Sequence, residues 1–302
     1  MSEPLLHVLV PSYGPSPYLA EALTSLVAAA DERTIVTVVD DGSPGAEVQQ
    51  AAATQPTVEY LRLDANHGVA GAFQRCLELS RGDYTVLMGS DDLVEPSYVA
   101  EVRALLRRFG RPAMVLPGVT VIDGQGHVAR PHADRVKGVL SPRGHEPRLL
   151  GGDRLAASLL MGNWLYFPAM AWRTDVARQL GFRQDLSTVL DLHLELRLLF
   201  DGEQLAWSPR PAFRYRRHAQ SESSRTAGSG ARFAEEQQVF RWAAREAAAL
   251  GWRRAAAAAR LHPTARLHAG LVRASRLRQR RRQLGSATGS APPGGAGSTG
   301  PE

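Results

Sequence analysis

The sequence predicts an α/β fold in which helices cover both faces of a mostly parallel central sheet. In the first third of the chain, short apolar runs alternate with segments of helical periodicity. Strands that are apolar throughout, separated by helices, are typical of parallel sheets buried on both faces. Several of these runs end in polar residues, where ligands bind in such sheets.

The predicted elements follow one another along the chain without long gaps. Strands are expected at residues 5–10, 34–39, 58–63 and 84–88, with helices at 16–30, 44–53 and 69–80. The second half is expected to add one or two strands at 113–122, helices at 153–161 and 188–200, and short strands at 204–208 and 211–217. Residues 131–152 are rich in Pro, Gly, Arg and His and are expected to form a loop over the site. A helical region begins at Ala231 and is broken near Gly251 and Pro263.

Composition restricts the class of protein. The single cysteine, Cys76, excludes an internal disulfide and a multi-cysteine metal site. No run of about 18 apolar residues is present, and the first four residues do not resemble a signal peptide. These observations predict a cytoplasmic protein. The alternative is a protein that binds peripherally to the inner face of the membrane.

The net charge of +6 comes from the C-terminal end. Residues 253–302 hold ten arginines and one acid, which gives +9, so the first 252 residues carry −3. We interpret the Arg-rich stretch as a solvated helical extension, with an amphipathic helix on an anionic membrane as the alternative. No nucleic-acid-binding module accompanies the arginines, so no nucleic-acid partner is predicted.

The most informative local feature is the acidic pair Asp91–Asp92, which follows an apolar strand. Two adjacent carboxylates repel each other, and burying them is costly unless a cation compensates. Mg2+ prefers carboxylate oxygens and fills its open positions with phosphate oxygens. The alternative is a helix cap, because Pro96 and a helical pattern follow. From this stretch alone, both interpretations remain open.

The order and spacing of several short motifs resemble the family-2 glycosyltransferases with the GT-A fold. The resemblance covers roughly residues 5–220, and it implies a Rossmann-like sheet, a nucleotide-sugar donor and inversion at the anomeric carbon. The motifs are Val8-Leu-Val-Pro-Ser-Tyr13, Val38-Val-Asp-Asp-Gly-Ser43, Asn66-His-Gly-Val-Ala70, Arg81-Gly-Asp-Tyr84, Gly89-Ser-Asp-Asp92 and Tyr215-Arg-Arg-His218.

The resemblance assigns donor binding to residues beyond the first four strands. Tyr13 would stack on the nucleobase, and Asp41 would accept a hydrogen bond from a uracil or thymine imide. The start of the third helix would place free backbone N–H groups near the diphosphate. The complete set of predicted donor contacts is Pro11, Tyr13, Asp41, Asn66, Gly68, Arg75, Ser90 and Asp91.

A metal site and a catalytic base are implied as well. Mn2+ or Mg2+ would be held by Asp92 with Asp91 and His218, although Gly89 stands where many family members have another acid. Asp191 aligns with the acid that serves as the base, but Leu190 replaces a neighbouring acid of the family pattern. The alternative is that Asp191 and Glu195 form the polar face of an ordinary helix.

The predicted organisation has three parts. A GT-A domain spans residues 1–222, divided into a nucleotide-binding half (1–110) and an acceptor half (111–222). A helical extension at 223–284 and a disordered tail at 285–302 follow. We predict transfer of a hexose-type sugar from a UDP or dTDP sugar to a glycan, lipid-linked or small-molecule acceptor. The alternatives are a sugar-phosphate nucleotidyltransferase, disfavoured because residues 11–15 hold no basic side chain, and a nucleotide-sugar-binding protein without transferase activity.

Overall fold

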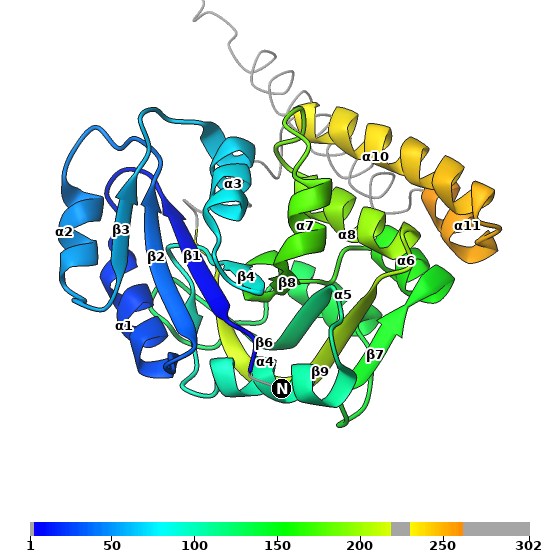
Figure 1. Cartoon of the computed structure of the whole chain (residues 1–302). Helices are drawn as coiled ribbons and strands as arrows, with labels where there is room; N and C mark the ends of the chain where they lie inside the picture. The colour runs from blue at the N-terminus through cyan, green and yellow to red at the C-terminus, as the bar shows by residue number, and fades with distance from the viewer. Residues whose placement is uncertain (1–2, 219–229, 262–302) are drawn as a thin grey trace, which may run out of the picture. The chain divides into compact units, whose positions relative to one another are not determined.

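A computed structural model describes residues 3–218 and 230–261 of the chain. Its centre is a nine-stranded mixed sheet with helices on both sides, which confirms the predicted α/β class (Figure 1). The strands lie in the order β3-β2-β1-β4-β8-β6-β9-β5, and β7 also pairs with β9. Four strands from the first third, β1 to β4, form a continuous parallel sheet.

Most strands and helices occur close to the predicted positions. The strands are β1 (Leu6–Ser12), β2 (Thr34–Asp40), β3 (Glu59–Arg62), β4 (Tyr84–Leu87), β5 (Leu93–Val94), β6 (Met114–Ile122), β7 (Arg148–Gly151), β8 (Ala171–Arg173) and β9 (Gln204–Arg216). The helices are α1 (Leu19–Ala29), α2 (Glu47–Ala53), α3 (Gly68–Leu79), α4 (Tyr98–Phe109), α5 (His132–Leu140), α6 (Gly152–Met161), α7 (Thr174–Leu180), α8 (Leu190–Phe200), α10 (Gly230–Ala249) and α11 (Arg253–Leu261). A short 3-10 helix, η1 (Phe167–Ala169), precedes β8.

One reversed strand, β8, joins the two halves of the sheet, and β6 beyond it runs in the same direction as the first four strands. β8 pairs antiparallel with both β4 and β6, so β6 runs parallel to β4. β9 pairs parallel with β6, whereas β5 and β7 are antiparallel to β9. The carboxyl ends of β1, β2, β4, β6 and β9 consequently lie along one edge of the sheet.

Two groups of helices enclose the sheet. α1 contacts both α2 and α4, and α3 contacts α7, which in turn contacts α8. The strands between them are apolar because they are buried on both faces: Val8, Leu9 and Val10 of β1 have no exposed surface. The helix predicted at 69–80 is α3, and its Cys76 is buried as a small core residue.

Two expectations for the second half were wrong. Residues 131–152, predicted as a loop, contain α5 and β7. Although this stretch is rich in Pro and Gly, Lys137 and Asp134 attach α5 to the rest of the protein, and β7 pairs with β9. The two short strands expected at 204–208 and 211–217 are the single strand β9. Register shifts beside Gly118 let β9 bend past Pro209 and Pro211 without ending.

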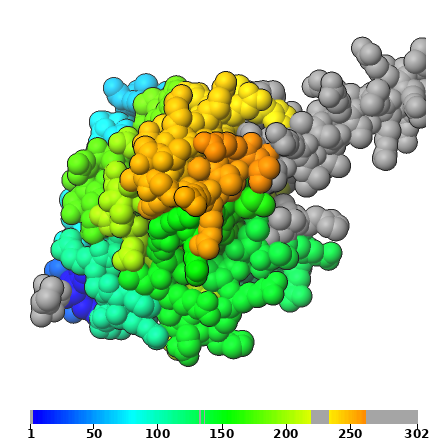
Figure 2. Space-filling model, turned by 90° about the vertical axis from the view of Figure 1, so that its right-hand side faces the viewer, coloured from blue at the N-terminus to red at the C-terminus, as the bar shows by residue number. Residues whose placement is uncertain are grey.

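The last two described helices cover the acceptor half. α11 packs on α6, and α10 packs on α8 and α11; Figure 2 shows α11 (orange) at the surface over green segments of the chain. Within the described ranges, no helix is long and apolar enough to cross a bilayer. The predicted disordered tail at 285–302 and most of the Arg-rich stretch lie outside the described residues.

Candidate active site

The candidate active site lies where the parallel strands end. β1 ends at Ser12 opposite Asp40 of β2, and β6 ends at Ile122 opposite Arg216 of β9. The turn that follows β4 enters the same region, because residues just beyond neighbouring parallel strands meet at one edge. This topology brings together residues that are more than a hundred positions apart in the sequence.

At this edge, the structure places His218 beside Asp91, and Asp92 is the next residue of the same turn. The Nε2 atom of His218 lies 2.9 Å from Oδ2 of Asp91. Asp92 is buried, and its Oδ1 atom accepts a hydrogen bond of 2.8 Å from the backbone N–H of Arg216. The Oδ2 atom of Asp92 is also buried and has no hydrogen-bond partner among the described residues. A carboxylate oxygen in this position is available to a cation.

Burial has a direct electrostatic effect on Asp92. Removal from water, together with the neighbouring Asp91 carboxylate, raises the pKa of Asp92 well above its usual range. The backbone N–H of Arg216 opposes this shift without cancelling it. A divalent cation would compensate both effects, because it favours the charged form of each carboxylate.

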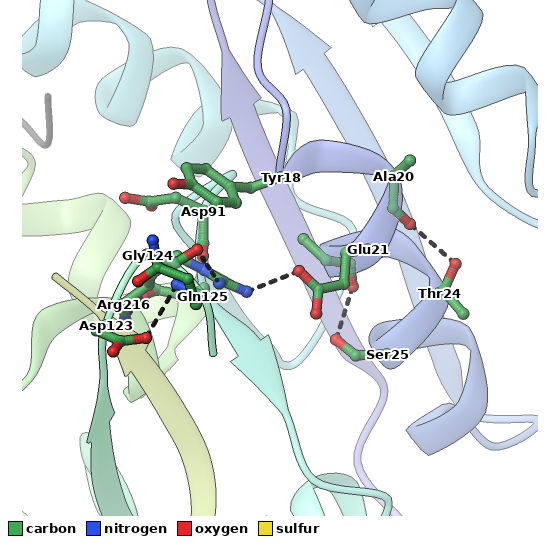
Figure 3. Close-up of polar contacts among 12 residues, drawn as sticks. Tyr18, Ala20, Glu21, Thr24, Ser25, Asp91, Asp123, Gly124, Gln125 and Arg216 are labelled. Atoms are coloured by element: carbon green, nitrogen blue, oxygen red, sulfur yellow. Dashed lines mark hydrogen bonds and ion pairs between the residues drawn. The ribbon is translucent and has the colours of Figure 1, made fainter. Parts of the chain in front are cut away.

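Arg216 connects this acidic turn to two other elements (Figure 3). Its guanidinium donates to the backbone oxygen of Asp91 at 2.7 Å, to that of Gly124 at 3.2 Å and to Oε2 of Glu21 on α1 at 2.7 Å. The Tyr18 ring covers the guanidinium, with 4.5 Å between the Arg216 carbon and the ring centroid. Because this arginine is almost completely buried, these bonds hold the turn in one position.

The backbone at Gly89 explains how two carboxylates fit into so short a turn. A Cβ atom at this position would lie 2.8 Å from Oδ1 of Asp91 and 2.8 Å from Oδ2 of Asp92. The carboxylates therefore occupy the space into which a side chain at position 89 would project. A side chain at position 89, as in many family members, would not fit with the two acids in these positions.

The predicted donor residues form a second group beyond β2 and β3. Asp41 is buried, and its two oxygens lie 3.0 and 3.1 Å from the backbone nitrogen of His67, which donates to them. Nδ1 of the same histidine lies 3.1 Å from Oδ1 of Asp41. Asn66 accepts a 2.8 Å bond from the N–H of Gly68, the first residue of α3, whose φ of +68° favours glycine. These contacts fix the turn at the start of α3.

The remaining predicted donor residues differ in exposure. Pro11 lies in β1, and the Tyr13 ring beyond it is 58% exposed, so one face can receive a planar base. Ser90 is half-buried in the acidic turn. Arg75 lies on the outer surface of α3, where its Nη1 atom is 2.6 Å from Oε2 of Glu78. The structure thus places Arg75 in an ion pair on its own helix.

Asp191 lies in a separate cluster in the first turn of α8. One of its carboxylate oxygens accepts a 2.7 Å bond from the backbone N–H of Leu192. Glu195, one helical turn later, is completely buried, and its Oε2 atom accepts a 2.8 Å bond from Asn163. Burial and the Asp191 carboxylate raise the pKa of Glu195 well above its usual range. The alternative of a solvated polar helix face does not describe Glu195.

Sequence reasoning did not identify Lys137, which approaches the same cluster from α5. Its Nζ donates to the backbone oxygen of Leu165 at 2.8 Å and lies 4.2 Å from the centroid of the Tyr166 ring. Burial lowers the pKa of Lys137 to about 8, while the carboxylates of Asp191 and Glu195 act in the opposite direction. Lys137 lies in a stretch that was expected to be a loop, and its burial depends on the helix α5 that forms there.

A metal site made of protein ligands alone is not present in the part of the chain that the structure describes. No three side chains of His, Cys, Asp or Glu in residues 3–218 and 230–261 come together as such a site. The Asp91–Asp92 pair and His218 supply fewer protein atoms than Mg2+ or Mn2+ coordinates. Such ions commonly complete their shell with water and substrate phosphate, so this small donor set fits a cation that arrives with a diphosphate.

Comparison with known proteins places this geometry in context. A protein-family model described as "Glycosyl transferase family 2" matches residues 7–173. The chain is 27% identical over 269 residues to an uncharacterized protein, MT1568, of Mycobacterium tuberculosis, and the match covers 83% of this chain and 82% of that protein. Chondroitin synthase of Escherichia coli is 24% identical over 198 residues, which cover 65% of this chain but only 26% of the synthase.

Solved structures share the fold at low sequence identity. Residues 1–349 of S. aureus TarS, solved in complex with UDP-GlcNAc, superpose with a TM-score of 0.61 at 17% identity. The match covers 80% of this chain and 66% of that fragment. The mannosyltransferase PcManGT from Pyrobaculum calidifontis, in complex with GDP-Man and Mn2+, gives a TM-score of 0.60 at 17% identity, covering 95% and 81% of the two chains.

Proposed function

Because the chain belongs to glycosyl transferase family 2, we propose that it transfers a sugar from a nucleoside-diphosphate sugar to an acceptor hydroxyl. The observation that carries this proposal is the buried pair Asp91–Asp92 at the carboxyl edge of the sheet, with His218 beside it. An unpartnered oxygen of Asp92 among the described residues is costly without a ligand. A donor diphosphate bound together with a cation would remove that cost.

The proposed donor site extends from the acidic pair towards β2. The exposed Tyr13 ring would stack on the base, an interaction worth about 1–3 kcal/mol in nucleic-acid-binding proteins. Asp41 accepts bonds from His67, and a further lone pair of its carboxylate would receive the imide N–H of uracil or thymine. We therefore favour UDP or dTDP as the carrier. UDP-GlcNAc in the TarS structure supports this choice, and GDP-Man in the mannosyltransferase structure makes GDP the competing carrier.

We propose that Asp92 and Asp91, with His218, hold Mn2+ or Mg2+ together with the diphosphate. The orphaned, buried Oδ2 of Asp92 and the acid pair fit such an ion. When bound, the cation would supply Lewis-acid neutralisation of the leaving diphosphate. Arg216 keeps the Asp91 backbone in place, and the short side-chain contact between His218 and Asp91 orients both groups. These contacts support a position for the departing diphosphate beside the acidic turn.

Asp191 is the proposed base of an inverting reaction. Its carboxylate would accept the proton of the acceptor hydroxyl while that oxygen attacks the anomeric carbon opposite the diphosphate. Lys137 lies near enough to interact electrostatically with Asp191, and its positive charge favours the ionised carboxylate. Glu195 holds its own proton more tightly because it is buried beside Asp191. The two carboxylates of the cluster therefore differ in environment, because only Glu195 is completely buried.

The proposal can be tested by separating binding from chemistry. A thermal-shift panel of UDP, dTDP and GDP with Mn2+ should show stabilisation by the correct carrier, because a bound ligand raises the melting temperature by mass action. Asp92→Asn should weaken metal-dependent binding at least about tenfold, or about 1.4 kcal/mol. Asp191→Asn should preserve this binding but lower the rate of diphosphate release roughly 100-fold or more.

A matched control lies on the same helix as the proposed base. Asp201 is exposed at the end of α8, so Asp201→Asn should change neither binding nor rate. Stabilisation by nucleotide and Mn2+ without diphosphate release for any donor and acceptor offered would support a binding protein instead. Equal activity of wild type and Asp191→Asn would remove Asp191 from the mechanism and leave the donor site intact.

A further inference from the structure

A cavity of about 550 Å3 lies in the acceptor half, between β6, β9 and α5. Its volume is in the range of roughly 300–1,000 Å3 that small-molecule sites occupy. Three aromatic side chains, Trp164, Tyr166 and Trp207, contribute to its wall. The acidic pair and Asp41 do not line this cavity, so it is separate from the proposed donor site.

Positive charge is concentrated around this cavity. Arg130, Arg135 and Lys137 all line it. The two arginines are exposed at the rim, and within the described ranges neither has a carboxylate partner. Lys137 is fixed deeper in the wall by its bond to the Leu165 carbonyl. A neutral ligand would only accept hydrogen bonds from these groups, whereas an anion would in addition be attracted by their charge.

The one acidic residue of the cavity wall does not cancel this charge. Asp134 is bound by Arg217, whose Nε lies 2.6 Å from the Asp134 Oδ2 atom. The Tyr166 hydroxyl donates a further 2.8 Å bond to Oδ1 of the same carboxylate. The charge of Asp134 is thus paired with Arg217, and the cavity presents a positive face to a ligand.

The cavity is also linked to the proposed base. Lys137 lines the cavity and lies within electrostatic reach of Asp191 on α8. Asp191 itself does not line the cavity. A ligand seated against Tyr166 would lie beside this lysine, whose Nζ is 4.2 Å from the Tyr166 ring centroid. If Asp191 removes the proton of an acceptor, the reacting hydroxyl has to reach past Lys137 towards α8.

We propose that this cavity binds the acceptor and that the acceptor is an anionic saccharide, with a carboxylate or a phosphate held by Arg130 and Arg135. The sugar ring would rest against the aromatic wall, and its reacting hydroxyl would point towards Lys137 and Asp191. This inference rests on the proposed function, because only a transferase requires a second substrate at this place.

Binding of three matched probes tests the inference without using activity. Saturation-transfer NMR on the full chain would compare methyl glucoside, methyl glucuronide and the 6-phosphate of methyl glucoside at millimolar concentration. Both anionic probes should bind at least about threefold more tightly than the neutral one, since exposed ion pairs contribute modestly. A preference for one anion identifies whether carboxylate or phosphate is recognised.

Two double variants locate the effect. Arg130→Gln with Arg135→Gln should abolish the preference for anionic probes, because both rim charges are removed. Arg241→Gln with Arg245→Gln removes the same charge from exposed positions of α10 and should leave the preference unchanged. Equal binding of charged and neutral probes by wild type, no binding of either anion, or an unchanged preference in the rim variant would overturn the inference. Nucleotide stabilisation with Mn2+, measured on the same samples, reports separately on the proposed function.

Discussion

At the scale of single residues, the arrangement of the acidic pair depends on the absence of a side chain at Gly89. The carboxylates of Asp91 and Asp92 both lie 2.8 Å from the point where a Cβ atom would be. A methyl group there would force them to move, although the backbone conformation itself does not require glycine at this position. The glycine is thus expected to matter for ligand binding more than for folding.

We predict that Gly89→Ala weakens metal-dependent nucleotide binding about tenfold, which corresponds to about 1.4 kcal/mol. The displaced carboxylates would no longer meet a cation in their present geometry. Titration calorimetry of the nucleotide in the presence of Mn2+ measures the effect, and the melting temperature without ligand should change little. Gly138→Ala is the control, because no atom lies within 4 Å of its added Cβ. Unchanged affinity in Gly89→Ala would show that the pair does not hold the ligand.

Sequence patterns predicted the site residues that directly follow a strand. They did not predict the residues that reach the site from distant parts of the chain. Asp91 and Asp92 stand out because charged residues directly follow an apolar run. Arg216 looked like one of many basic residues, and only the pairing of β9 with β6 buries it against Glu21. Lys137 gave no signal for the same reason, since its burial comes from contacts with residues far along the chain. Local patterns do not carry such long-range contacts.

At the scale of elements, the end of β9 serves both halves of the site. Successive side chains of an extended strand point to opposite faces. Arg216 accordingly reaches α1 and the acidic turn, whereas the next residue, Arg217, reaches Asp134 on α5. His218 returns to Asp91. Three consecutive residues thus connect the proposed donor site with the wall of the cavity.

We predict that Arg217→Gln loosens α5 without unfolding the protein. The Arg217–Asp134 ion pair ties this helix to β9, and its loss should raise amide hydrogen exchange in His132–Leu140 about fivefold, or about 1 kcal/mol of local stability. Hydrogen exchange followed by mass spectrometry measures this. Arg214→Gln is the matched control, because Arg214 pairs with Glu95 instead. Equal exchange in both variants would contradict a role of Arg217 in holding α5.

Sequence patterns failed to predict the elements that contain residues unfavourable for a helix or a strand. α5 forms in a stretch rich in Pro and Gly, and β9 continues through Pro209 and Pro211. Both depend on neighbours: Lys137 and Asp134 attach the helix to the core, and the register shift at Gly118 accommodates the prolines. The first third has no such conflict, and there pattern and structure agree.

The C-terminal helices lead to a prediction about the folding unit. Trp242 of α10 packs on His193 and Phe200 of α8, and α11 lies on α6. A chain ending at residue 222 would expose these surfaces, and each Å2 of apolar surface left in water costs roughly 25 cal/mol. We expect the 1–262 fragment to unfold in urea like the full chain, whereas 1–222 should unfold at a lower urea concentration. Equal midpoints for the two fragments would show that α10 and α11 contribute nothing to stability.

At the scale of the whole molecule, stability should depend on pH through two buried histidines, His7 and His193. In β1, the backbone N–H of Arg81 donates to Nδ1 of His7 at 3.0 Å, and Nε2 lies 2.8 Å from the Thr37 hydroxyl. That hydroxyl donates to Glu59, so it must accept from His7, which fixes the neutral Nε2–H form. Burial, with the Arg81 charge, lowers the pKa of His7 to about 4. Burial, with Arg183 and Arg197, lowers that of His193 to about 4 as well.

The direction of the effect follows from these pKa values. The unfolded chain, with a histidine pKa of about 6.5, binds protons before the folded protein does. Stability from both histidines is therefore complete above pH 6.5 and is lost as the pH falls from 6.5 to about 4. Asp92 and Glu195 act oppositely, since their raised pKa values let the folded protein take up protons first. Asp31 and Asp185, with pKa values of about 2, affect stability only below pH 4.

We predict that His7→Gln makes the free energy of unfolding less dependent on pH in this window. Between pH 6.5 and 4 the wild type should lose about 1–3 kcal/mol more than the variant, because the opposing carboxyl groups are present in both. Urea unfolding at several pH values measures the difference. His145→Gln, at an exposed position, should reproduce the wild-type curve. Parallel curves for wild type and His7→Gln would contradict this prediction. They would mean that protonating His7 does not destabilise the fold, although the N–H of Arg81 already occupies its Nδ1 atom.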